Sequence, residues 1–119
     1  MAEDTYRKER SAVIEDIKMS IKRRMEANKA NPNYINMALQ FAESNVGKYE
    51  PEIKRMVGFR EDARAARDSG NAERFEQKTA AYGRYTARIS QNIRDSYNTG
   101  VLVSNKEKLK AHAKEKAEA

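Results

Sequence analysis

Apolar side chains recur at steps of three and four residues through most of this chain, and only two prolines interrupt it. This spacing places them on one face of an α-helix, whereas a half-buried strand would need strict alternation. The pattern therefore predicts an all-α fold: an antiparallel bundle of three long helices plus a short C-terminal helix or tail. We expect residues 1–104 to form the bundle domain and residues 105–119 a basic helical tail rich in Lys, Ala and Glu.

The first helix is expected from about Thr5 to Lys29. Thr5 is the predicted N-cap, because a threonine hydroxyl can accept a hydrogen bond from a free backbone N–H at a helix start. The apolar stripe of this helix consists of Tyr6, Val13, Ile14, Ile17, Ile21 and Met25.

The second helix is expected to begin near Pro32, with Asn31 as its cap, since proline at the first helical position loses no needed hydrogen bond. Its apolar stripe runs through Ile35, Leu39, Ala42, Val46, Tyr49, Ile53, Met56 and Val57. The stripe passes Gly47 and Pro51 without losing phase. A short break and a kink are both compatible with Pro51, and the unbroken phase favours a kinked pair that shares one interface.

Residues 68–71, Asp-Ser-Gly-Asn, predict a tight antiparallel hairpin, with Gly70 at a left-handed C-terminal position and Asn71 capping the next helix. That helix is expected from about Ala72 to Asn98, with a coiled-coil-like seam that includes Thr79 and Thr86. The large side chains of the seam are the candidate residues for self-association or a partner: Phe75, Tyr82, Ile89, Ile93 and Tyr97.

Thr99 and Gly100 are expected to end this helix. Residues 101–103, Val-Leu-Val, would then lie across the end of the bundle as an apolar lid. Ser104 or Asn105 could cap a final helix, which would be marginal alone because Leu109 is its last large apolar residue.

The sequence has few of the residue types that form catalytic or metal sites. The chain has no cysteine, and His112 is the only histidine, so the usual zinc, di-iron and Ser-His-acid sites lack their residues. The glycines are isolated, so no phosphate-binding loop is present. We therefore expect no enzyme activity, no cofactor, no metal and no small-molecule substrate.

The charge is basic and spread along the chain, with a net charge of +6 and a pI of about 9.6. Ion-paired, solvated helix faces are the commoner explanation of such a pattern. Nucleic-acid binding is the alternative, because it needs clustered cations and gains from exposed aromatic rings. The candidate contacts are the compact basic run and the one aromatic expected to be exposed beside arginines: Lys22, Arg23, Arg24, Arg84, Tyr85 and Arg88.

No apolar run resembles a signal peptide or a membrane span, which leads us to expect a cytoplasmic protein unless a targeting segment has been removed. Long polar helices with narrow apolar stripes suit coiled-coil-like contacts better than a thick closed core. The sequence therefore predicts a structural or adaptor protein that acts through protein–protein contacts, by self-association or by assembly into a larger complex.

Overall fold

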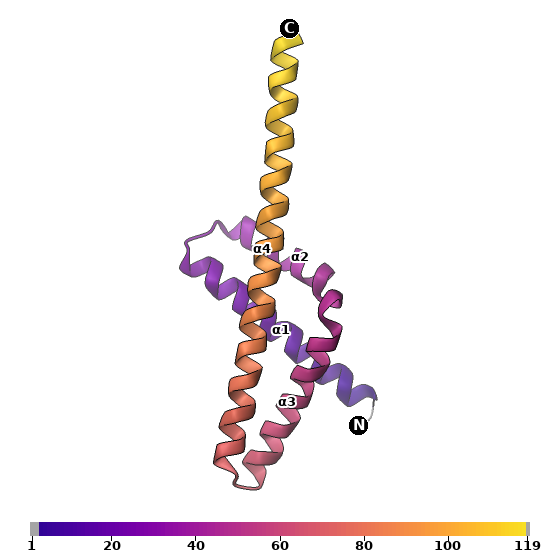
Figure 1. Cartoon of the computed structure of the whole chain (residues 1–119), viewed down its shortest axis with the longest axis vertical. Helices are drawn as coiled ribbons and strands as arrows, with labels where there is room; N and C mark the ends of the chain where they lie inside the picture. The colour runs from indigo at the N-terminus through magenta and orange to yellow at the C-terminus, as the bar shows by residue number, and fades with distance from the viewer. Residues whose placement is uncertain (1–2, 119) are drawn as a thin grey trace.

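The computed structural model describes residues 3–118, and all of its regular structure in that range is helical. The elements are α1 (Glu3–Ala27), α2 (Pro32–Asn45), the 3-10 helix η1 (Val46–Tyr49), α3 (Glu50–Asp68) and α4 (Ala72–Glu118). The predicted all-α class is confirmed. The arrangement is more open than a regular antiparallel bundle, because α1 crosses α4 obliquely while α3 and α4 form a hairpin (Figure 1).

Both ends of α1 differ from the prediction. The helix already includes Glu3, so Thr5 lies inside its first turns and is not its N-cap. At the other end α1 stops at Ala27, because Lys29 adopts a left-handed conformation with φ of 59°. The N–H of Ala30 then donates to the carbonyl of Met25 at 3.0 Å, which closes the helix end.

The start of α2 is as predicted, with the Asn31 side chain accepting a hydrogen bond from the Asn33 N–H at 2.8 Å. The predicted disturbance near Gly47 and Pro51 takes the form of the 3-10 turn η1, where the chain changes direction (Figure 1). Pro51 lies in the first turn of α3, where its missing N–H costs no hydrogen bond. The apolar phase is kept across the bend, because Val46 and Ile53 are both buried in the core.

The predicted hairpin between α3 and α4 is confirmed in detail. Gly70 has a φ of 75°, and the N–H of Asn71 donates to the Ala66 carbonyl at 2.8 Å. Asn71 also caps α4, because its side-chain oxygen accepts from the Arg74 N–H at 3.1 Å. This is a Schellman end followed at once by an N-cap, which reverses the chain in few residues.

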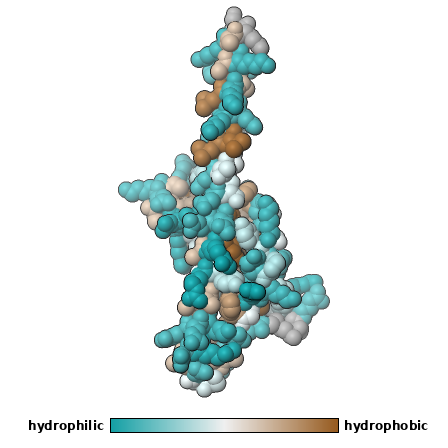
Figure 2. Space-filling model, in the orientation of Figure 1, coloured by the Kyte–Doolittle hydropathy of each residue, from teal (hydrophilic) through white to brown (hydrophobic). Residues whose placement is uncertain are grey.

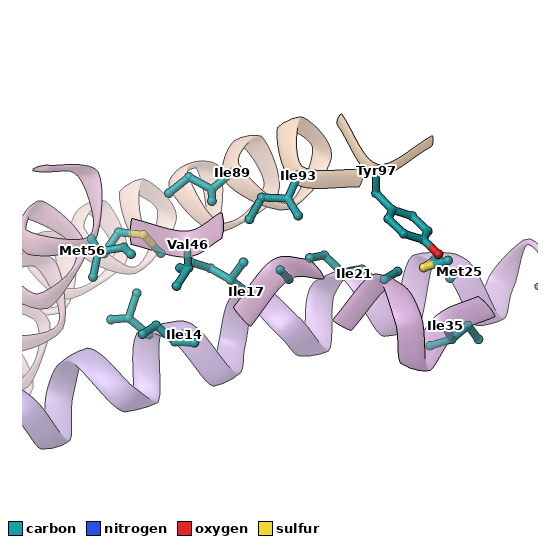
Figure 3. Packing of buried hydrophobic residues seen from close by; sticks show 14 of the residues in the cluster. Ile14, Ile17, Ile21, Met25, Ile35, Val46, Met56, Ile89, Ile93 and Tyr97 are labelled. Carbon is teal, nitrogen blue, oxygen red and sulfur yellow. The ribbon is translucent and has the colours of Figure 1, made fainter. Parts of the chain in front are cut away.

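One apolar core joins all the helices, and Figure 3 shows α1, α2 and α4 contributing side chains to it. Its largest fully buried apolar residues are Ile17, Ile21, Ile53, Met56, Ile89 and Ile93. The buried hydroxyl of Ser90 on α4 lies 2.6 Å from the Thr86 carbonyl and 3.3 Å from that of Ile17 on α1. The predicted stripes of the first two expected helices are therefore the surfaces that build this core.

The predicted end of the last helix at Thr99 and Gly100 is wrong, since α4 continues to Glu118 over 47 residues. A single glycine costs a helix only about 1 kcal/mol relative to alanine, and no proline follows it. Leu102 and Val103 remain exposed, at 62% and 50%, so residues 101–103 do not form a lid. Ser104 and Asn105 lie inside α4 and cap no separate helix.

Candidate interaction surfaces

The proposed self-association seam on α4 is largely occupied by the chain itself. Ile89, Ile93 and Tyr97 are buried, and Figure 3 shows them directed toward the core side chains of α1. Association through these three residues would require the core to open. Phe75, at the hairpin end of α4, is 38% exposed, because α1 does not reach that far along α4. The seam therefore holds α4 onto the rest of the chain, and in this conformation it is not a free surface.

Tyr82, the remaining seam residue, belongs to a polar network that joins three helices. Its hydroxyl donates to Asp16 of α1, which also accepts from Arg60 Nη1 of α3 at 3.4 Å. Arg60 Nε and Arg64 Nη2 donate to the two carboxylate oxygens of Glu9, at 2.8 and 2.9 Å.

The two arginines affect the protonation of this network. Hydrogen bonds from Arg60, and then from Arg64, lower the pKa of Glu9 below its ordinary value. Burial raises the pKa of Tyr82 above its ordinary value, and the hydrogen bond to Asp16 adds to this. At neutral pH Glu9 is therefore ionised and Tyr82 protonated, the states that suit their partners. The network is a polar clamp between α1, α3 and α4.

The basic run on α1 contributes to an open groove between α1 and α4. This groove has a volume of about 710 Å³. Its lining residues are Asp16, Met19, Ser20, Arg23, Arg24, Ala27, Tyr82, Gly83, Thr86, Ala87, Gln91 and Arg94. Lys22 does not line it and pairs with Glu26 at 3.9 Å. Sequence reasoning missed Arg94, because it is far from Arg23 and Arg24 along the chain and meets them only through packing.

Tyr85 was expected to be an exposed aromatic, and the structure corrects this. It is half-buried, with Phe59 of α3 packed edge-on at 5.2 Å between ring centroids. The Arg88 guanidinium lies 4.6 Å from the Tyr85 ring centroid, and Arg55 Nη1 donates to its hydroxyl at 3.2 Å. The hydrogen bond from Arg55 lowers the pKa of Tyr85. The ring is thus already covered by the chain's own side chains.

The predicted nucleic-acid contacts are not brought together into one surface. Arg23 and Arg24 line the groove between α1 and α4. Tyr85 and Arg88 line a small hollow on the side of α4 that meets α3. Arg84 is exposed on α4 and lines neither of these two hollows.

A second surface lies where α4 leaves the other helices. An apolar hollow of about 410 Å³ is present there between α2 and α4. Its lining residues are Tyr34, Met37, Phe41, Tyr97, Gly100, Val101, Ser104, Asn105 and Lys108. The Tyr34 and Phe41 rings lie 5.2 and 5.4 Å from the Tyr97 ring, between centroids. Beyond the hollow, α4 projects without neighbours, and apolar residues are visible along it (Figure 2).

Within residues 3–118, no group of three or more His, Cys, Asp or Glu side chains is placed to hold a metal ion. His112 is exposed on the projecting part of α4. In the same range, none of the helices is both long enough and apolar enough to span a membrane. Comparisons with protein-family models, with curated proteins and with solved structures found no match.

Proposed function

We propose that this chain is a non-catalytic helical protein that acts through protein–protein contacts, and that the projecting end of α4 joins two copies of it. The observation that carries the proposal is the exposure of Leu102 and Leu109, at 62% and 68%, on the part of α4 that leaves the other helices.

The projecting stretch of α4 receives little stabilisation from packing within the monomer. In proteins, tertiary packing of an apolar face normally supplies most of the stability of a helix. Leu102 and Leu109 are separated by one heptad, so they lie on the same helix face. A second helix along that face would bury both leucines and stabilise the projecting stretch.

The heptad positions on either side of the leucines favour a second copy in antiparallel orientation. Asp95 precedes Leu102 by one heptad and Lys116 follows Leu109 by one, and both charged residues are exposed. In an antiparallel pair, Leu102 lies opposite Leu109 of a second copy, and Asp95 lies opposite Lys116 of that copy. The four contacts are self-complementary, as a two-fold interface requires.

A parallel pair would place Asp95 opposite Asp95 and Lys116 opposite Lys116, which repel each other. The charge pattern of this face therefore selects the antiparallel arrangement.

Light scattering after size exclusion, over a range of protein concentrations, tests the proposal. We expect the full chain to form a dimer, and the double variant Leu102→Ala/Leu109→Ala to dissociate at concentrations at least tenfold higher than the wild type. The matched control is Glu107→Gln, an exposed substitution on another face of the same stretch, which should leave the dimer intact.

A charge exchange tests the orientation. Asp95→Lys should weaken the dimer by placing like charges together, and Asp95→Lys/Lys116→Asp should restore it. A chain that stays monomeric at all concentrations would overturn the proposal, as would a dimer that the leucine variant leaves unchanged. A dimer that Asp95→Lys strengthens would contradict the antiparallel pairing.

A further inference from the structure

The groove between α1 and α4 contains three arginines for which no ion pair is found within residues 3–118. Arg23 and Arg24 come from α1 and Arg94 from α4. We propose that this groove binds an acidic amphipathic helix of a partner protein, whose carboxylates meet the arginines and whose apolar side chains meet the floor. This inference goes beyond self-association, because the groove does not include Leu102 or Leu109.

Several cations of the packed helices have acidic partners. Lys18 pairs with Glu43 at 3.0 Å, and Arg60 and Arg64 share Glu9. By contrast, none of the ion pairs found among residues 3–118 includes Arg23, Arg24 or Arg94.

Arg94 also has an unused hydrogen-bond donor. Its Nε atom is buried and forms no hydrogen bond within the described part of the chain. Arginine binds carboxylates through two parallel hydrogen bonds, so these three side chains are suited to an acidic ligand.

The floor of the groove has small side chains, which allow another backbone to approach closely. Gly83 and Ala87 are one turn apart on α4, and Ser20 and Ala27 are on α1. A Cβ atom placed on Gly83 would meet no atom within 4 Å, so the space above this glycine is open. Small side chains allow a helix to approach, and Met19, which is 40% exposed, supplies an adaptable apolar contact.

The length of the groove fits a short helix. Its lining residues on α1 run from Asp16 to Ala27. At a rise of 1.5 Å per residue this stretch is about 16 Å long, or about three helical turns. A partner helix of similar length could place acidic residues on successive turns opposite the arginines.

The same residues are less suited to nucleic acid. Tyr82 is the only aromatic among the lining residues, and its hydroxyl is held by Asp16, so no free ring is available for base stacking. The arginines of the groove suit the acidic face of an amphipathic helix, and its Met, Ala and Gly residues suit the apolar face.

Fluorescence anisotropy of the full chain with labelled synthetic probes tests the proposal. The probes are a 14-residue amphipathic peptide with Glu on one face and Leu and Ala on the other, the same peptide with Gln for Glu, and a single-stranded oligonucleotide. We expect the Glu peptide to bind at least tenfold more tightly than either other probe.

The groove variants locate the binding. Arg94→Gln and Arg23→Gln/Arg24→Gln should each lower the affinity for the Glu peptide about tenfold. Gly83→Leu should also lower this affinity, because the leucine side chain fills the space above the groove floor. The matched control Arg84→Gln removes an exposed arginine of α4 outside the groove and should have no effect. Circular dichroism and thermal melting show whether each variant still folds.

Three results would overturn the proposal. The first is tighter binding of the oligonucleotide than of the Glu peptide through the same arginines, which would make the groove a nucleic-acid surface. The second is no binding of the Glu peptide, and the third is a loss of peptide affinity in Arg84→Gln equal to that in the groove variants. The Leu102→Ala/Leu109→Ala variant should bind the peptide with the wild-type affinity. Loss of peptide binding and loss of self-association can therefore be measured separately.

Discussion

The two parts of α4 have the same backbone geometry and very different surroundings. Before Asn98 the helix packs on the rest of the chain and buries Ile89 and Ile93 almost completely. After Asn98 it leaves the core, against which Val101 is still partly buried, and it then projects and exposes Leu102 and Leu109. The comparison shows that the helical conformation and the burial of its apolar face have separate causes in this protein.

The packed part is stabilised by burial, which contributes about 1.5–3 kcal/mol for each large aliphatic side chain removed from water. The projecting part depends on local propensity, supplied by its Lys, Glu and Ala residues, and on whatever covers its leucines. Substitutions in the two parts should therefore have different consequences, and four predictions test this, from the largest expected effect to the smallest.

Ile93→Ala should have the largest effect on folding. It removes three buried methyl and methylene groups from the core, and such truncations cost about 2–5 kcal/mol. Leu109→Ala, at a protein concentration that keeps the chain monomeric, should change the free energy of unfolding by less than about 0.5 kcal/mol. Urea unfolding followed by circular dichroism measures both, and similar losses in the two variants would remove the distinction between the two parts.

The polar clamp on the packed part should make its stability depend on pH. Because the pKa of Glu9 is lowered in the folded chain, its contribution is complete above the ordinary pKa and is lost as pH falls through the folded pKa. Glu9→Gln should cost about 1 kcal/mol at pH 7, since Arg60 and Arg64 are partly exposed to solvent. The difference from the wild type should shrink as pH falls through the lowered pKa of Glu9 and the carboxylate becomes protonated. A difference that persists unchanged at low pH would exclude the charged hydrogen bonds as its cause.

Gly100→Ala tests whether the helix passes continuously from the packed part into the projecting part. Alanine is more favourable than glycine inside a helix by about 0.8–1 kcal/mol, and a Cβ at this position meets no atom within 4 Å. The variant should increase the far-ultraviolet helical signal. Gly70→Ala is the matched contrast, because the left-handed φ of 75° should make the same substitution destabilising by about 1 kcal/mol. A helical signal that falls in Gly100→Ala would indicate a turn at this position.

Tyr97→Phe should have the smallest effect, although Tyr97 is the last core residue before the projecting part. The Tyr97 hydroxyl is buried and forms no hydrogen bond within residues 3–118, so its removal should change the free energy of unfolding by less than about 0.5 kcal/mol. Thermal melting measures this. A loss above 1.5 kcal/mol would show that the hydroxyl has a partner that stabilises the fold.

Local interactions explain why much of the fold could be predicted. The cap at Asn31, the left-handed Gly70 and the apolar stripe of α1 each depend on residues within a few positions of one another. Short stretches of sequence therefore determine the geometry of these features. The prediction was wrong at Gly100 because one glycine without a following proline costs a helix only about 1 kcal/mol and does not end it.

The candidate surfaces depend on contacts between distant segments. Phe75 and Ile89 share one predicted seam, yet only Ile89 is buried, because the oblique crossing of α1 covers one part of α4 and leaves the hairpin end open. Arg94 joins Arg23 and Arg24 by the same crossing. Helical periodicity determines which residues share a face, and it carries no information on which face another helix will cover. Long-range packing settles that, because burial depends on the partner segment as much as on the residue itself.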